Sequence, residues 1–402
     1  SVTTPAHMRE ILDTIDEALA AGRGVYFHCW GGIGRTGTVV GCWLVRHGWP
    51  GEQALVRVQA LFDTTRKAGR RSPEATCQDD MVRAWAEQDR PPLRGRFRGA
   101  MLGLAAGDAL GTTIEFSPRG ARTVSDIVGG GPFSLPAGAW TDDTSMALCL
   151  AESLVERGTF DPLDQMERYL RWYDDGYMSS TGDCFDIGST TSQALRRFAS
   201  TRDPYAGSTA ADKAGNGSLM RLAPVPLAFS RDAGEAIARA ADSSRTTHGA
   251  IAAVDACRYY AGLIVGALRG EDKETLLSDR YAPIPGYWEE HPLCPEVDAI
   301  ARGSYKAKGE PQISASGYVV HTLEAALWAF YHTEDFREGC LRVVNLGQDA
   351  DTTGAVYGQL AGAFYGEEGI PEGWRRILVR ADLIADLADG LYRLATARPF
   401  VR

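Results

Sequence analysis

Residues 345–362 read NLGQDADTTGAVYGQLAG and predict a buried helix whose first turn carries acidic groups. Asp349 and Asp351 stand just before an apolar stretch, in positions that aspartate favours at a helix start. Glycines then recur at every fourth position up to Gly362, which keeps one face of the helix free of side chains. Such a face lets another helix approach closely. We therefore expect a core helix that directs its acidic N-terminus toward a central site.

Three more segments upstream combine acidic and small polar residues. They read GDALG at 107–111, TDDT at 141–144 and DCFDIGSTT at 183–191. Long helical patterns alternate with Gly-, Ser- and Asp-rich loops around them, and strand-like alternation is scarce. We therefore predict one mostly helical domain over residues 91–402, a size that a single large core can accommodate.

The TDDT segment and the DADTT segment predict a metal centre. Neighbouring carboxylates repel one another unless a cation is present, and oxygen ligands without Cys or His suit Mg²⁺ or Mn²⁺ better than zinc. Helix capping is the alternative for either segment alone, because Asp and Thr are favoured at helix N-termini. Two such segments favour a metal site, in which four carboxylates with Thr141 and Thr352 could hold two divalent ions.

A different pattern occurs near the N-terminus, where residues 28–37 read HCWGGIGRTG. Cys29 follows Val25–His28, which we predict to be a short buried strand, and precedes a predicted helix. The amides of such a loop and the helix N-terminus can cradle an anion and lower the pKa of a thiol. Arg35 supplies a planar fork for two phosphate oxygens. A buried cysteine beside a Gly-rich turn is the alternative interpretation.

This loop resembles the signature of the protein tyrosine phosphatase superfamily in its dual-specificity branch. The resemblance implies that its cysteine and arginine are catalytic and that residues 1–90 form a small α/β domain, with a Pro-containing linker at 89–95. The general acid of that superfamily has no good match, because Asp13 and Asp16 lie inside a predicted helix. We therefore expect a partial module, truncated or a remnant, with weak or no phosphatase activity.

The segments of the larger domain resemble the ADP-ribosylglycohydrolase family, including its dinitrogenase reductase-activating members, over nearly all of residues 95–370. The family fold is an all-helical orthogonal bundle. The resemblance implies hydrolysis of the bond between ADP-ribose and an acceptor, so the expected partners are ADP-ribose and ADP-ribosylated proteins or small molecules. It also implies that two Mg²⁺ or Mn²⁺ ions are held by Thr141, Asp142, Asp143, Asp349, Asp351 and Thr352.

The same resemblance assigns residues to the dinucleotide. The segment GNGSLMR at 215–221 is Gly-rich, and successive amides in such a loop can cradle a pyrophosphate. The alternatives are a plain turn for this loop, a helix cap or surface position for His248 and a core position for Tyr318. The implied substrate-binding residues are Asp108, Asn216, Gly217, Ser218, Met220, His248 and Tyr318.

Two carboxylates are candidates for catalysis beside the metal ligands. Glu115 lies seven residues after Asp108, at the offset of a functional glutamate in some family members; its alternative is a surface or supporting carboxylate. Asp186 matches an aspartate of the arginine-directed branch, where it faces the guanidinium group of the substrate. Ser189 stands where that branch has asparagine, so O-linked ADP-ribose on serine or an acyl ester stays an alternative.

The composition narrows the classes of function. The chain has 402 residues, of which 44% are hydrophobic and 23% charged, as in an ordinary globular protein. A formal net charge of -10 gives no general attraction for nucleic acid. No uninterrupted apolar run is long enough to predict a membrane span. The eight cysteines include no Cys-x-x-Cys pair and indicate reduced thiols, so we expect a cytoplasmic protein.

Four functions remain from this reasoning. The leading one is hydrolysis of ADP-ribosyl-arginine, and the second is hydrolysis of O-linked ADP-ribose. The third is a cysteine-dependent phosphatase at the N-terminal loop, which would need no metal. The fourth is a non-catalytic ADP-ribose-binding module, against which the intact set of six ligand residues argues.

Overall fold

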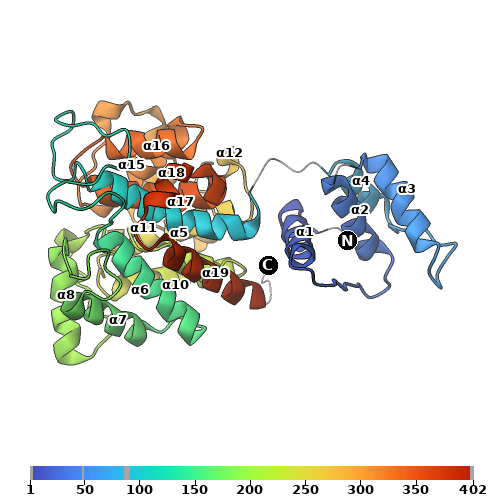
Figure 1. Ribbon diagram of the computed structural model, residues 1–402, viewed down its shortest axis with the longest axis horizontal. Helices are drawn as coiled ribbons and strands as arrows, with labels where there is room; N and C mark the ends of the chain where they lie inside the picture. The colour runs from blue at the N-terminus through green and yellow to red at the C-terminus, as the bar shows by residue number, and fades with distance from the viewer. Residues whose placement is uncertain (1–2, 48, 86–90, 399–402) are drawn as a thin grey trace. The chain divides into compact units, whose positions relative to one another are not determined.

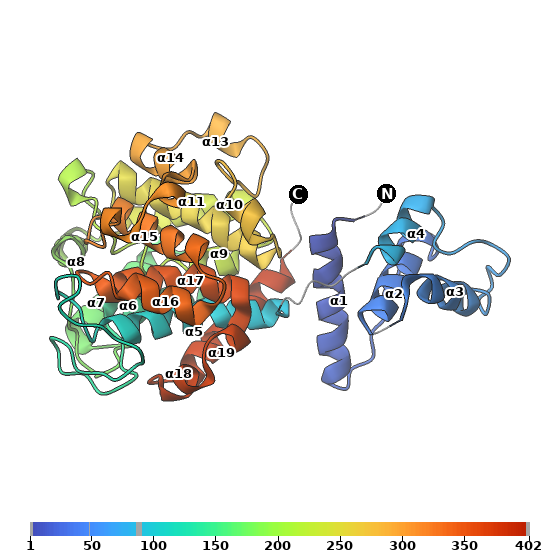
Figure 2. The same cartoon turned by 90° about the horizontal axis from the view of Figure 1, so that it is seen from above.

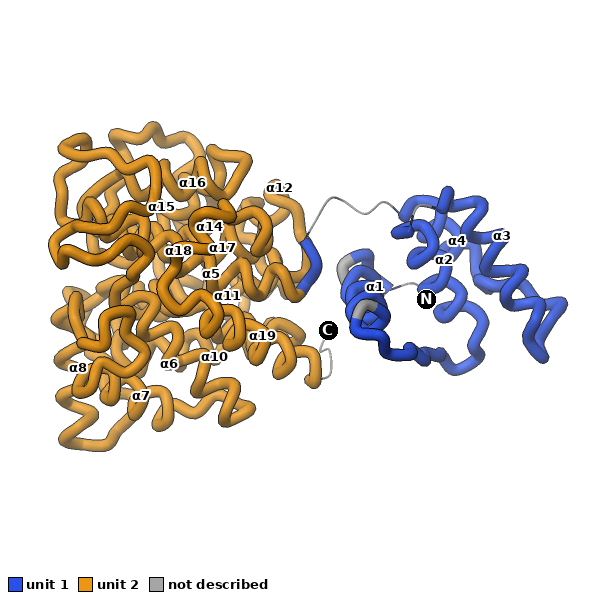
Figure 3. The backbone as a smooth tube through the Cα atoms, in the orientation of Figure 1, with its two compact units in different colours: residues 1–93 blue, residues 94–402 orange. Residues whose placement is uncertain are grey.

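The computed structural model describes residues 3–47, 49–85 and 91–398. Within these residues the regular structure is helical, with a few isolated β-bridges and no strand. The mostly helical fold class expected from the sequence is therefore confirmed. The chain divides into two compact units, Ser1–Leu93 and Arg94–Arg402, each described by itself (Figure 3).

The smaller unit is built from helices around a small apolar core. Their bounds are α1 (Pro5–Ala20), α2 (Gly34–Arg46), α3 (Gly51–Phe62) and α4 (Thr76–Arg83). Helix α1 begins after Thr4, whose hydroxyl accepts a hydrogen bond of 3.3 Å from the amide of His7, and Pro5 at the first position suits a helix start. The apolar faces of the helices meet in a core formed by Met8, Leu12, Ile15, Val39, Cys42, Leu44, Ala54, Val58, Val82 and Trp85.

The segment before Cys29 does not form the buried strand that the sequence predicts. Val25–His28 has no regular structure, and Tyr26 is 88% exposed. A strand is stable only when its backbone groups pair with a neighbour, and the described part of this unit contains no other strand. The α/β pattern expected here is thus absent from that part. Of the predicted linker at 89–95, residues 89 and 90 lie outside the described residues, and a helix already begins at Leu93.

The larger unit is a bundle of long helices that cross one another, connected by loops and short helices (Figures 1 and 2). The bounds are α5 (Leu93–Gly111), α6 (Asp142–Arg157), α7 (Pro162–Asp175), α8 (Ser189–Thr201), η1 (Ala211–Lys213), α9 (Pro224–Ala228), α10 (Ala233–Arg245), α11 (Ile251–Leu268), α12 (Lys273–Leu276), α13 (Tyr287–Glu290), α14 (Pro295–Ala301), η2 (Ser304–Ala307), η3 (Glu310–Gln312), α15 (Val319–His332), α16 (Phe336–Val344), α17 (Ala350–Gly369), α18 (Glu372–Ile377) and α19 (Ala381–Ala397).

Helices α5 and α17 lie side by side (Figures 1 and 2). Where they meet, glycines of one helix face the backbone of the other. A methyl group added to Gly103 would overlap the carbonyl oxygen of Gly358, and one added to Gly358 would overlap that of Gly103. Glycine is required because any Cβ would force the helices apart. The same relation pairs Gly99 with Gly362 and Gly107 with Gly354. The expectation of a core helix that another helix approaches closely is confirmed.

Among the described residues, only helix α11 is both long and apolar enough to be a candidate membrane span. Its window Ile251–Leu268 has a mean hydropathy of 1.4, so by length and composition alone it could cross a bilayer. However, 89% of this window is buried inside the unit, where the helix packs against α10, α15 and α17. Packing within the bundle therefore accounts for its apolar character.

Candidate active site

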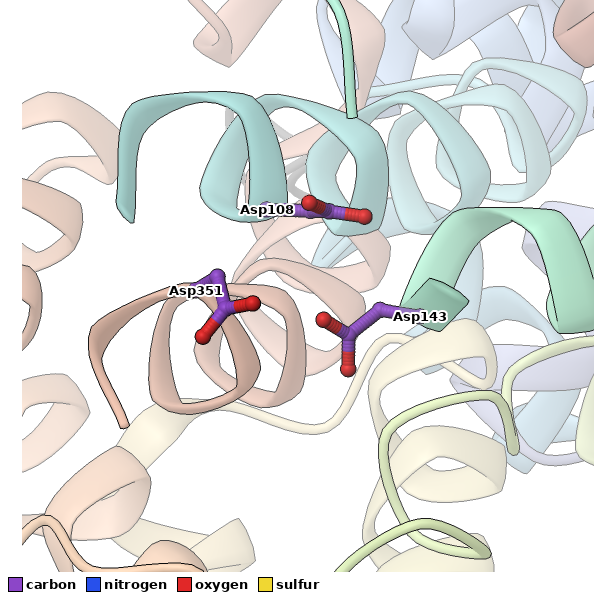
Figure 4. A group of neighbouring side chains, drawn as sticks. All are labelled: Asp108, Asp143 and Asp351. Carbon is purple, nitrogen blue, oxygen red and sulfur yellow. The ribbon is translucent and has the colours of Figure 1, made fainter. Parts of the chain in front are cut away.

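The ends of three helices bring carboxylates together inside the larger unit (Figure 4). Asp108 lies near the end of α5, Asp143 in the first turn of α6 and Asp351 in the first turn of α17. One carboxylate oxygen of each lies within 4.8 Å of the other two, and all three residues are buried. The glycine contacts between α5 and α17 hold two of these helix ends side by side. The N-termini of α6 and α17 also favour negative charge.

A second acidic group shares one member with the first. Carboxylate oxygens of Glu115, Asp186 and Asp351 also lie within 4.8 Å of one another. Glu115 follows the end of α5, and Asp186 lies in the loop before α8 with a φ of 62°. This left-handed conformation is uncommon for a residue with a side chain and clusters at functional sites. Asp351 is therefore the residue on which both acidic groups converge.

Several carboxylate oxygens of these groups have no hydrogen-bond partner. The hydroxyl of Thr141 lies 3.0 Å from Asp108, 3.1 Å from Asp143 and 3.3 Å from Asp351, but its single hydrogen serves one carboxylate at a time. Buried oxygens of Glu115, Asp143 and Asp351 remain without a partner among the described residues. Such oxygens are costly unless a cation or a hydrogen bond compensates them.

Burial and mutual repulsion oppose ionisation of these groups. Burial, followed by the charge of Asp186, raises the pKa of Glu115 to about 10, and burial raises the pKa of Asp186 to about 7. The same causes raise the pKa values of Asp142, Asp143 and Asp351 well above the usual range. A divalent cation would stabilise the ionised forms, and the donors are the hard oxygens that Mg²⁺ or Mn²⁺ prefers. The residues present therefore fit such a cation.

Asp108, which the family resemblance assigns to the substrate, lies behind the residues that face the cavity. It is fully buried and does not line the cavity described below. Its carboxylate accepts hydrogen bonds from the amide and hydroxyl of Thr141 at 2.9 and 3.0 Å, and from those of Thr144 at 3.1 and 2.6 Å. Burial raises the pKa of Asp108 to about 6, although these hydrogen bonds favour its ionised form. Asp108 therefore fixes the start of α6 and positions Thr141.

The acidic groups border a cavity of about 1530 Å³, large enough to hold a dinucleotide. Ser218, which the resemblance assigns to the substrate, does not line it; its hydroxyl instead lies 2.8 Å from that of Ser244, in the core. Thr141 and Asp143 lie behind the cavity wall. The other residues singled out in this domain line the cavity: Glu115, Asp142, Asp186, Asn216, Gly217, Met220, His248, Tyr318, Asp349, Asp351 and Thr352.

The Gly-rich loop is tied directly to the acidic side of the cavity. The Asn216 side chain donates hydrogen bonds of 2.6 Å to Asp349 and 2.9 Å to the hydroxyl of Thr322. The Asn216 amide also donates to the carbonyl of Gly317 at 3.1 Å, next to Tyr318. Tyr318 is half-buried at the cavity wall and not a core residue. The loop, the start of α15 and the start of α17 therefore form one continuous surface.

Some cavity residues were not identified from the sequence. Phe116 and Phe133 line the cavity with their rings 6.4 Å apart, and Phe116 is 65% exposed with a φ of 60°. An aromatic residue directly after the candidate Glu115 was an available signal. Gln348, which also has a positive φ, precedes the predicted ligand Asp349.

The Cys29 loop of the smaller unit has part of the expected local chemistry. The amide of Cys29 donates a hydrogen bond of 3.0 Å to the hydroxyl of Thr36, and α2 begins within the loop at Gly34. Burial opposes ionisation, but hydrogen bonds from Thr36 and from the amides of Ile33 and Gly32 outweigh it and lower the pKa of Cys29 to about 6. Arg35 is exposed in the first turn of α2.

The fold and the larger site define a helical protein whose acidic centre, able to hold divalent cations, borders a dinucleotide-sized cavity. Comparison with known proteins agrees. A family model described as ADP-ribosylglycohydrolase matches residues 89–399. "ADP-ribosylarginine hydrolase Tri1" of Serratia proteamaculans is 41% identical over 305 residues, covering 76% of this chain and 81% of that relative. A solved structure titled "ADP-ribosylglycohydrolase-related protein complex" is 47% identical with a TM-score of 0.66, covering 75% of this chain and 99% of that one.

The chain therefore belongs to the ADP-ribosylglycohydrolase family, and it is a glycohydrolase that releases ADP-ribose from an acceptor. A more distant relative, "ADP-ribosyl-[dinitrogen reductase] glycohydrolase" of Rhodospirillum rubrum, is 31% identical over 292 residues, or 71% of this chain and 90% of that relative. A second family model, described as "Polymorphic toxin system, DSP-PTPase phosphatase", matches residues 1–49. That match agrees with the resemblance of the Cys29 loop to phosphatase signatures.

Proposed function

We propose that this enzyme hydrolyses the bond between ADP-ribose and arginine, and that it depends on two divalent cations, Mg²⁺ or Mn²⁺. The observation that carries the proposal is the position of Asp351, which belongs to both acidic groups and has a buried oxygen without a partner. We assign the cation ligands to Thr141, Asp142, Asp143, Asp349, Asp351 and Thr352, with Glu115 and Asp186 beside them.

The chemistry divides between the cations and the protein. When bound, the cations would supply Lewis acidity toward the hydroxyls of the distal ribose and toward water. Asp108 keeps Thr141 in place through its hydrogen bonds, and the Gly-rich loop offers its amides to the pyrophosphate. The surrounding carboxylates stabilise the positive charge that develops at the anomeric carbon. The ribose would thus be oriented between the acidic groups and the loop.

Asp186 supports arginine as the acceptor. Its carboxylate lines the cavity and can pair with a guanidinium group through two parallel hydrogen bonds. An arginine-linked group leaves as a guanidine that readily holds its proton, so little acid assistance is needed. A serine-linked group would need a proton donor, which Asp186 cannot provide when a bound cation or guanidinium group keeps it ionised. The 41% identical relative is also named as an arginine-directed hydrolase.

The test compares ADP-ribosyl-arginine and ADP-ribosyl-serine peptides, with and without Mg²⁺ or Mn²⁺. We expect faster release from arginine, loss of activity on chelation, and about a tenfold to hundredfold slower reaction of arginine substrates in Asp186→Asn. Asp183→Asn is the matched control, because Asp183 is exposed on the same loop and does not line the cavity. Release from serine that is as fast, and unaffected by Asp186→Asn, would assign the enzyme to the O-linked class.

The lowered pKa of Cys29 favours a second function, a cysteine-dependent phosphatase in the smaller unit. A thiolate at the start of a helix is the nucleophile that such chemistry needs. The strand expected to support the loop is not formed, and no general acid was identified in the sequence. We therefore rank this function below both forms of ADP-ribose hydrolysis and expect weak activity.

A further inference from the structure

Arg221 is a fully buried cation that forms no ion pair with the described residues. Its guanidinium group donates to the carbonyl of Gly217 and, at 2.7 Å, to the hydroxyl of Thr247, and it lies 4.8 Å from the ring centre of Tyr169. Its Nε atom is buried and has no hydrogen-bond partner in the part of the chain that the structure describes. An unpaired buried charge is costly, so its position at the end of the Gly-rich segment, behind the residues of that segment that line the cavity, calls for an explanation.

The contacts of Thr247 connect this cation to a cavity residue. The hydroxyl oxygen of Thr247 lies 2.7 Å from Arg221 Nη2 and 2.9 Å from Nδ1 of His248. Arginine can only donate, so this oxygen accepts from Arg221 and its own hydrogen is free to point at the imidazole. Nδ1 of His248 then accepts, because a donating Nδ1 would leave the hydroxyl hydrogen without a partner among the described residues.

A neutral imidazole that accepts at Nδ1 carries its hydrogen on Nε2. Burial, followed by the charge of Arg221, lowers the pKa of His248 to about 3, so the ring is neutral. His248 is 2% exposed, yet it lines the cavity. Its Nε2 edge faces the Gly-rich loop, since a Cβ added to Gly217 would lie 3.2 Å from Nε2 and one added to Gly215 3.4 Å from it.

We propose that Arg221 is a positioning residue which, through Thr247, fixes His248 as a neutral Nε2–H donor to an anionic oxygen of the ligand. Under the proposed function, on which this inference rests, that oxygen belongs to the pyrophosphate of ADP-ribose. The glycines of the loop leave room for the phosphate beside Nε2, and the unpaired charge of Arg221 adds a favourable field behind it. Arg221 itself does not line the cavity and need not touch the ligand.

The first test is the tautomer of His248, read from nitrogen NMR spectra of the full-length wild-type protein. The chain has seven histidines, and His248→Gln identifies the resonance. We expect a protonated Nε2 and an unprotonated Nδ1 near neutral pH. A protonated Nδ1, or a doubly protonated ring, would overturn the proposal. The variant serves only to assign the resonance, and the tautomer itself is read in the wild-type protein.

The second test measures ADP-ribose binding by calorimetry, together with KM and kcat. We expect Thr247→Val to weaken ADP-ribose binding and raise KM by about tenfold to a hundredfold with little change in kcat, and Thr247→Ser to bind as the wild type does. Thr246→Val is the matched control, because the Thr246 hydroxyl is also buried and 3.5 Å from Arg221 Nη2, but its hydrogen-bond partners among the described residues do not include His248. Equal losses of ADP-ribose affinity in Thr246→Val and Thr247→Val would contradict the proposed connection from Arg221 through Thr247 to His248.

The proposed function and the positioning role of Arg221 can be refuted separately. If the wild-type protein does not bind ADP-ribose, the proposed function itself is wrong. If it binds ADP-ribose but Thr247→Val binds equally well, the function stands and the positioning role of Arg221 is refuted. Weaker binding in Thr247→Val, restored by Thr247→Ser, supports both.

Discussion

The Cys29 loop and the Asp351 centre both lie at the start of a helix, yet their surroundings shift ionisation in opposite directions. At Cys29, hydrogen bonds from a hydroxyl and two amides lower the pKa of the thiol to about 6. At Asp351, burial and neighbouring carboxylates raise the pKa well above the usual range. The helix dipole favours negative charge in both places. Its effect is therefore decided by how many anions share the site and how deeply they are buried.

The two regions also differ in what supports them. The segment before Cys29 is exposed and without regular structure, and the neighbouring Trp30 is 99% exposed. Asp351 instead lies in the first turn of α17, a helix that packs against α5 through direct contacts between glycines. A sequence signature can be equally clear in two places while the packing behind it is present in one and incomplete in the other.

Among the tests of this difference between the two regions, Asp351→Asn should give the largest loss of activity. Loss of the carboxylate shared by both acidic groups should lower kcat/KM for ADP-ribosyl-arginine by roughly 10³-fold or more, because several kcal/mol of charge stabilisation are removed. Added Mg²⁺ or Mn²⁺ should raise the Tm of the wild type but not of the variant. Asp382→Asn, an exposed change on α19, serves as the control. Retained activity in Asp351→Asn would refute the assigned centre.

A pair of glycine substitutions tests the difference in packing. Gly358→Ala places a methyl group onto the carbonyl oxygen of Gly103 and should reduce the free energy of unfolding by about 1–3 kcal/mol. Gly24→Ala in the smaller unit meets no atom within 4 Å and should leave stability nearly unchanged. Thermal and denaturant unfolding measure both variants. Equal stability of the two would show that the α5–α17 contact is less tight than described.

The pH dependence of stability tests the raised pKa of Asp186 at the acidic centre. Burial raises the pKa of Asp186 to about 7, above the value near 3.9 of an unfolded aspartate. The folded protein then binds the proton more tightly, so this stabilisation is complete at low pH and is lost as the pH rises through about 7. The metal-free protein should therefore have a higher Tm near pH 6 than near pH 8. Asp186→Asn should show a smaller difference, and an unchanged difference would argue against the shift.

The smallest effect is expected from Cys29→Ser. ADP-ribosyl-arginine hydrolysis should be unchanged, because thiol chemistry plays no part at the acidic centre. Turnover of an aryl phosphate by the wild type should be weak or absent, since the signature strand is not formed. Rapid aryl phosphate turnover that disappears in Cys29→Ser would show that the smaller unit is an active phosphatase after all.

Much of the fold followed from local patterns in the sequence. The four-residue spacing of glycines up to Gly362 predicted a helix with a closely packed partner, and the structure has it. Two prolines and a shift in composition separated the N-terminal module from the larger domain. Local spacing encodes such features because a helix repeats regularly along its own chain. The prediction of a strand at Val25–His28 was wrong, because a strand depends on pairing with segments that can lie far away in sequence, which local spacing does not reveal.

The sequence by itself determined which residue types to expect at the candidate site, namely paired aspartates, a Gly-rich loop and a histidine. Only the tertiary structure decided their relations. It placed Asp108 where its carboxylate supports Thr141, and it brought Glu115 and Asp186 next to Asp351. It also placed the unpaired charge of Arg221 behind His248. These relations join segments that lie far apart along the chain, and they arise from the packing of helix ends, which no local spacing of residues can specify.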